Sequence, residues 1–80
     1  MQDAGIQSGD ILVVDRSLVP MDRRIVVAMI DGEFTVKRFR SLEGRIYLEA
    51  ANDQFPRLEI SGDQELVIWG VVAFVIHPAR

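Results

Sequence analysis

The chain has 80 residues, of which 49% are hydrophobic, and a net charge of −3 at pH 7. This length allows one small domain, and the acidic balance argues against direct electrostatic binding to nucleic acid. Cysteine is absent, which excludes a disulfide framework and a thiolate metal site, and the apolar run at 66–76 is too short for a transmembrane helix, which needs about 20 residues.

Short runs of β-favouring residues separated by turn signals cover the chain. They predict six strands, at residues 11–14, 24–30, 33–40, 45–49, 58–60 and 65–77. The run at 11–14 lacks alternation, as expected of a strand covered on both faces, and a polar loop follows it at 15–23. Asp31-Gly32 predicts a type I′ hairpin between the second and third strands, because both central residues of that turn need a positive φ.

The third predicted strand carries the residue that is the strongest candidate for a chemical role. A period of two places Phe34 and Val36 on one face and Thr35, Lys37 and Phe39 on the other. Taken alone, this pattern indicates a strand lysine whose stem crosses apolar surface while its ammonium group stays in water.

The last strand is apolar on both faces. Strict alternation predicts that one face carries Leu66, Ile68, Gly70, Val72, Phe74 and Ile76 and the other Val67, Trp69, Val71, Ala73 and Val75. Both faces should be covered, either by the loops of this fold or by a second chain. A glycine in the middle of a strand, Gly70, marks a bend, a bulge or a close backbone approach.

These strands predict an all-β fold, a small coiled sheet or partly open barrel. The single histidine, His77, stands near the C-terminus, which argues against a metal site and against a Ser-His-Asp set. The aspartates near turn signals are interpreted as turn or capping residues: Asp10, Asp15, Asp31, Asp53 and Asp63. Periodicity and spacing alone therefore indicate a small β domain that acts as an interaction module.

The order of three segments adds a resemblance. Residues 1–15 resemble the segment that follows the nucleophilic serine of LexA-type self-cleaving peptidases, where Ser-Met, three residues, Gly-Ile, two residues and Gly-Asp precede an aliphatic strand. The positions that match this pattern are Met1, Gly5, Ile6, Gly9 and Asp10. Residues 31–38 resemble the hairpin that carries the catalytic lysine of that family, and residues 68–72 resemble its C-terminal strand. Within the family, the chain looks most similar to UmuD-like proteins.

The resemblance implies a LexA/signal-peptidase-like fold and a Ser–Lys dyad in which Lys37 is the general base. A neutral lysine then takes the proton of a serine hydroxyl, and the alkoxide attacks a backbone carbonyl. In the family this serine immediately precedes the position of Met1, and none of Ser8, Ser17, Ser41 and Ser61 falls on it. We therefore expect residues 1–80 to be a truncated LexA/UmuD-type peptidase domain, through a misassigned start or as a fragment, and to lack peptidase activity alone.

The resemblance also implies a role in the DNA-damage (SOS) response. The family cleaves itself when stimulated by RecA filaments, and the processed form is a dimeric partner of an error-prone DNA polymerase subunit. We expect a cytoplasmic homodimer with no cofactor, no metal, no membrane partner and no direct nucleic-acid binding. The alternative is the C-terminal dimerisation and self-cleavage domain of a LexA-like or phage repressor. A third hypothesis is an intact peptidase related to signal peptidases. It would need a nucleophilic serine and a membrane anchor.

Overall fold

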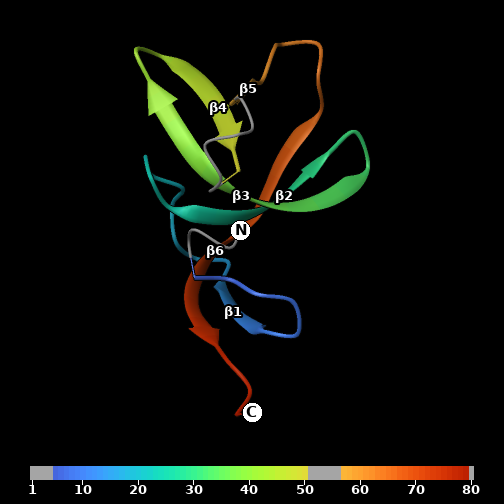
Figure 1. Cartoon of the computed structure of the whole chain (residues 1–80). Helices are drawn as coiled ribbons and strands as arrows, with labels where there is room; N and C mark the ends of the chain where they lie inside the picture. The colour runs from blue at the N-terminus through green and yellow to red at the C-terminus, as the bar shows by residue number, and fades with distance from the viewer. Residues whose placement is uncertain (1–4, 51–56, 80) are drawn as a thin grey trace.

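The computed structural model describes residues 5–50 and 57–79. The strands of this part are β1 (Ile11–Asp15), β2 (Ile25–Ile30), β3 (Glu33–Leu42), β4 (Arg45–Glu49), β5 (Leu58–Glu59) and β6 (Leu66–Ile76). They form one antiparallel sheet in the order β1-β6-β2-β3-β4-β5 (Figure 1). The predicted all-β fold is confirmed, and the strand bounds agree with the prediction to within about two residues. In the described ranges no helix is long and apolar enough to cross a membrane.

Two tight turns connect the middle strands. Asp31 and Gly32 have φ values of 49° and 88°, and β2 pairs with β3 directly across them, with Ile30 opposite Glu33. These positive φ values are those that a type I′ turn requires, which confirms the predicted hairpin. Glu43 and Gly44, with φ values of 50° and 79°, join β3 to β4 in the same manner.

β6 is the long central element, and it runs from the upper half of the molecule to the lower half in Figure 1. It pairs with β2 and with β1, and each ladder contains a register shift. Val26 and Val27 lie opposite Val71 and Gly70, whereas the next residue, Ala28, lies opposite Ile68. Trp69 is therefore the extra residue of a β-bulge.

This bulge corrects the alternation predicted for the last strand. Val71, and not Gly70, shares a face with Ile68, because directly opposite residues project from the same face. The second shift, between Val13 and Val14, restores the predicted face for the end of the strand, since Val13 lies opposite Phe74. A pattern with a period of two cannot show where an extra residue is inserted into a strand.

Gly70 permits a close approach between strands. A Cβ atom at this position would collide with Cγ1 of Val14 on β1. Beside it, Arg16 Nε donates a hydrogen bond of 3.1 Å to the carbonyl oxygen of Trp69, and the Arg16 guanidinium carbon lies 4.7 Å from the centre of the Trp69 ring. The predicted special role of Gly70 is thus confirmed, as both a bulge neighbour and a contact point.

The two faces of the sheet differ. The buried apolar side chains are Val26, Ala28, Phe39, Leu48 and Val71, and the registers place all of them on one face, which we call the core face. Partly buried side chains pack against this cluster: Ile30, Ile60, Leu66 and Ile68. The opposite face, which we call the open face, carries Val27, Met29, Phe34 and Val36.

The expectation that the chain itself covers both faces of β1 and β6 is wrong for the described residues, and cover of β6 by a second chain stays a prediction. Ile11 and Phe74 are 61% and 68% exposed, and Val67 is 54% exposed. β1 is an edge strand with one neighbour, and the buried cluster of the core face draws on β2, β3, β4 and β6 but includes no residue of β1. The loop between β1 and β2 also exposes apolar side chains: Leu18, Val19 and Met21.

We expect Gly70→Ala to lower the free energy of unfolding by about 1–3 kcal/mol, because its methyl group overpacks the contact with Val14. Gly62→Ala is the matched control, since a Cβ there meets no atom within 4 Å, and its effect should stay within about 0.5 kcal/mol. Urea denaturation of both variants measures the difference. Equal effects of the two substitutions would contradict the assigned contact.

Candidate functional site

Lys37 lies on the core face, in the middle of β3. It is directly opposite Val26, which is in turn directly opposite Val71 on β6. These two valines are the largest fully buried side chains, at 0% and 1% exposure. Lys37 itself is half-buried, so its stem begins beside the most buried pair of the core.

The neighbours of Lys37 along the strand are those that the sequence predicts. Thr35 is half-buried and lies opposite the fully buried Ala28, and Phe39 is 7% exposed and lies opposite Leu48. The predicted grouping of Thr35, Lys37 and Phe39 on one face is confirmed. Lys37 is also the only lysine in the chain.

No carboxylate of the described residues forms an ion pair with Lys37. The same row across the sheet ends at Asp15, opposite Val71 on β1. Three strand spacings separate Asp15 from Lys37, which is about 14 Å. Asp15 is also engaged locally, because its Oδ1 accepts hydrogen bonds from the Ser17 hydroxyl at 2.6 Å and from the Ser17 backbone N–H at 2.8 Å.

A primary amine in this setting has a chemistry besides that of a surface cation. A lysine amine in its neutral form can accept a proton from a hydroxyl. Three of the four serines of the described part are placed elsewhere: Ser17 bonds to Asp15, Ser61 contacts Gln64, and Ser41 lies about 13 Å further along β3. The fourth, Ser8, is exposed in a turn ahead of β1.

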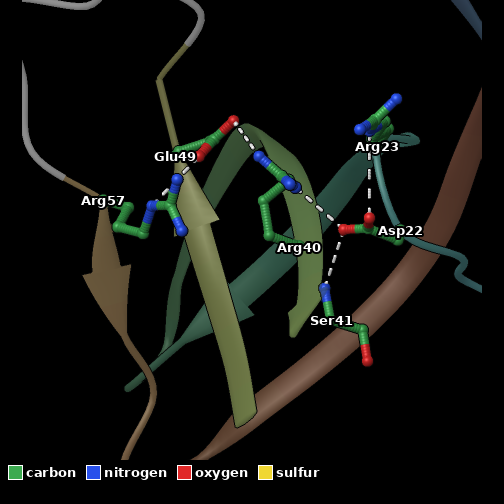
Figure 2. A network of polar contacts seen from close by, with 6 residues as sticks. All are labelled: Asp22, Arg23, Arg40, Ser41, Glu49 and Arg57. Carbon is green, nitrogen blue, oxygen red and sulfur yellow. Dashed lines mark hydrogen bonds and ion pairs between the residues drawn. The ribbon is translucent and has the colours of Figure 1, made fainter. Parts of the chain in front are cut away.

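A network of charged side chains lies on the other side of β3 (Figure 2). Arg40 projects from the open face, where it lies opposite Tyr47. Its Nε donates to Asp22 Oδ1 at 2.8 Å, and its Nη1 donates to Glu49 Oε1 at 3.3 Å. The backbone N–H of Ser41 also donates to Asp22 Oδ1, at 2.9 Å. The loop between β1 and β2 is thereby fixed to β3.

Arginines extend this network at both ends. Arg57 Nε lies 3.5 Å from Glu49 Oε2, and Arg23 Nε lies 3.9 Å from Asp22 Oδ2 (Figure 2). The hydrogen bond from the Arg40 side chain, followed by that from the Ser41 N–H, lowers the pKa of Asp22. The bond to Asp22 in turn raises the pKa of Arg40. Arg40 and Glu49 are 16% and 17% exposed and Asp22 is 35% exposed, so the Arg40–Glu49 pair is the best shielded part of the network.

The structure assigns turn and capping roles to three of the five aspartates, as predicted. Asp15 holds Ser17, Asp10 Oδ2 accepts the Gln7 N–H at 2.7 Å, and Asp31 Oδ1 accepts the Glu65 N–H at 3.2 Å. The Ser17 hydroxyl lowers the pKa of Asp15. Asp63 lies in an exposed turn, and Asp53 lies outside the described residues.

Sequence reasoning missed two contacts. Asp22 and Arg40 are 18 positions apart, and His77, which sequence reasoning considered only as a metal ligand or catalytic residue, places its Nδ1 2.8 Å from Asp10 Oδ2. Both contacts depend on strand registers, for which no local sequence signal exists. Among the described residues no group of three or more side chains is arranged to bind a metal ion.

Residues 1–73 match the family model described as Peptidase S24-like. Protein ImpA of Escherichia coli is 48% identical over 80 residues, which is 100% of this chain and 54% of ImpA. Protein MucA of Escherichia coli is 49% identical over 81 residues, with 98% of this chain and 55% of MucA covered. The LexA repressor of Bordetella petrii is 40% identical over 77 residues, with 96% and 34% covered. The chain spans about half the length of ImpA and MucA.

We expect Asp22→Asn to reduce stability at pH 7 and to weaken the loss of stability in acid. The pKa of Asp22 is lowered in the folded protein, so its stabilising effect is present above the unfolded value of about 3.9 and is lost as the pH falls through the folded value. Urea midpoints of both proteins at pH 3 to 7 measure this. Their difference should shrink below about pH 4.

Asp63→Asn is the control, because it alters an exposed turn carboxylate. It should change the urea midpoint little at any pH in this range. A midpoint difference between the parent protein and Asp22→Asn that stays constant from pH 7 to pH 3 would contradict the assigned role of the carboxylate.

Proposed function

The chain is a UmuD-like member of the Peptidase S24-like family, and on this basis we propose that Lys37 is the general base of a Ser–Lys self-cleavage dyad. The serine would occupy the position immediately before Met1. Residues 1–80 are then the C-terminal part of the peptidase domain, and they are inactive as a peptidase without that hydroxyl.

The placement of Lys37 supports this proposal most directly. It is half-buried on the core face, opposite the fully buried Val26 and beside Phe39, and the described residues offer it no carboxylate partner. A surface role would be served better on the open face, where Arg40 finds both Asp22 and Glu49. A half-buried amine without an acidic partner is compatible with the role of a lysine base.

The proposed role of the protein is that of a cytoplasmic accessory factor for mutagenesis in the SOS response. Self-cleavage is stimulated by RecA filaments, and the processed form binds an error-prone DNA polymerase subunit. The acidic balance of the chain, −3 at pH 7, supports a role in which partners hold the DNA.

The second candidate is the C-terminal domain of a LexA-like repressor, and the 40% identity to the LexA repressor of Bordetella petrii supports it. The identities to ImpA and MucA are higher, at 48% and 49%, and favour the first candidate. The region ahead of Met1 discriminates the two, because a repressor carries a helix-turn-helix domain there.

We also propose that the chain forms a homodimer through its open face. Val67, Met29 and Phe34 lie opposite one another across β6, β2 and β3. Val67 is 54% exposed and Phe34 is 60% exposed, and the next row on the same face, Val27 and Val36, is half-buried. An apolar surface that spans three adjacent strands suits an isologous contact with a second copy.

The dyad is tested in a chimera. The residues of ImpA that precede its matched segment are placed ahead of Met1, because under the proposal that part of ImpA carries the serine and the cleavage site. Incubation with RecA filaments should produce two fragments on a denaturing gel, and Lys37→Ala should slow their formation by at least about 1,000-fold, because the dyad loses its base.

Arg38→Ala is the matched control, since Arg38 is the next residue on β3 and projects from the open face. It should leave the cleavage rate within about threefold of the parent chimera. Cleavage that survives Lys37→Ala would refute the assignment of the base.

The dimer is tested with Phe34→Asp, which places a charge on the proposed contact. We expect it to raise the dimer dissociation constant by about tenfold or more in sedimentation equilibrium. Phe74→Asp is the matched control at another exposed phenylalanine, 68% exposed at the β1–β6 end. Disruption of the dimer by Phe74→Asp and not by Phe34→Asp would contradict the proposal and would indicate an interface at the β1–β6 end.

A further inference from the structure

The open face has an excess of positive charge at one end. In the network of Figure 2, three arginines share two carboxylates, and an arginine stands at each outer position. These outer arginines are the exposed ones, since the side chains of Arg23 and Arg57 are 80% and 45% exposed. Arg23 lies 3.9 Å from Asp22, whose Oδ1 already accepts bonds from Arg40 and Ser41. We call this group the basic end: Asp22, Arg23, Arg40, Glu49 and Arg57.

The opposite end of the same strands is acidic. Asp31 follows β2, and its N–H donates to the Glu65 carbonyl oxygen at 3.0 Å while its Oδ1 accepts the Glu65 N–H at 3.2 Å. Both residues are exposed, and neither carboxylate forms an ion pair with another described residue. Glu65 precedes Leu66, which lies on the core face opposite Ile30, so alternation directs the Glu65 side chain to the open face. We call Asp31 and Glu65 the acidic end.

The apolar rows of the open face lie between these two ends. β2 is six residues long, so the ends are separated by about 20 Å. Val27 and Val36 form the row nearer the basic end, and Val67, Met29 and Phe34 form the row nearer the acidic end. The two charged ends therefore lie on opposite sides of the surface that the proposed dimer buries.

This order of charges distinguishes between the two ways in which a second copy can meet the face. Two copies that pack face to face are related by a two-fold axis in the plane of the contact. An axis along the strands places each end against the same end of the other copy, so that like charges meet. An axis across the strands reverses the strand direction of the second copy and places each basic end against an acidic end. Like charges in a contact are unfavourable, and opposite charges fix the alignment.

We propose that a second copy of the chain binds the open face with its strands antiparallel to those of the first, so that the basic end of each copy contacts the acidic end of the other. This inference rests on the proposed homodimer and adds its orientation. Each dimer then contains two identical charged contacts, one on each side of the apolar rows. In this alignment the carboxylates of Asp31 and Glu65 gain cationic partners from the second copy.

Charge reversal at both ends tests the alignment. Glu65→Lys alters a side chain whose contacts in the fold are made through the backbone, and Arg23→Glu alters the most exposed cation of the network. Each change alone removes the attraction at both contacts, and we expect each to raise the dimer dissociation constant about fivefold in sedimentation equilibrium at about 0.1 M salt.

The double variant gives the decisive comparison. Glu65→Lys and Arg23→Glu in one chain restore an opposite pair across the contact, so the dissociation constant should return to within about twofold of the parent value. Within one copy the two side chains cannot compensate each other, because their separation of about 20 Å exceeds the screening length of about 10 Å. A general loss of stability would not be repaired by a second reversal.

Glu33→Lys is the matched control. Glu33 is exposed at the same end of the hairpin but lies opposite Ile30 on the core face. The substitution changes the net charge of the chain as Glu65→Lys does, and it should alter the dissociation constant by less than about twofold.

Single reversals that leave the dissociation constant unchanged would overturn the alignment, as would a double variant that dimerises more weakly than either single variant or an equal effect of Glu33→Lys. If Phe34→Asp disrupts the dimer and the charge reversals do not, the alignment alone is rejected. A parent protein that sediments as a monomer at every concentration rejects the homodimer and its alignment together.

Discussion

The pairing of β2 with both β3 and β6 is the constraint on which the rest of the structure depends. It places Val26 between Lys37 and Val71, and it buries the two valines almost completely. The core and the candidate base thus share one row of the sheet. A slip of one residue in either ladder would turn Lys37 to the open face and Val36 inward, so the fold and the proposed chemistry are specified by the same registers.

Arg40 and Lys37 lie on opposite faces of β3 and differ in their ion pairs. On the open face, Arg40 forms ion pairs with Asp22 and Glu49, and this network anchors the loop between β1 and β2. On the core face, Lys37 is half-buried opposite Val26 and forms no ion pair with a carboxylate of the described residues. The first arrangement holds the loop between β1 and β2 against β3. The second leaves the amine without an acidic partner among the described residues, which is compatible with the proposed role of Lys37.

Local chemistry accounts for what the sequence predicts correctly. The Asp31-Gly32 turn, the faces of β3 and the grouping around Lys37 follow from the steric needs of a turn and from a period of two. The bulge at Trp69 does not follow, because an inserted residue leaves no compositional mark. The Asp22–Arg40 and Asp10–His77 contacts join distant segments, and only knowledge of the registers brings such partners together.

The bulges in β6 have a consequence for the behaviour of the chain in concentrated solution. Its 11 residues are almost all apolar and β-favouring, a composition that supports fibrillar stacking in many alignments. The two irregular steps give the strand an uneven spacing that a straight copy of itself cannot match. Slipped or stacked assemblies would forfeit backbone bonds at each step, and so the irregularity protects an otherwise aggregation-prone sequence.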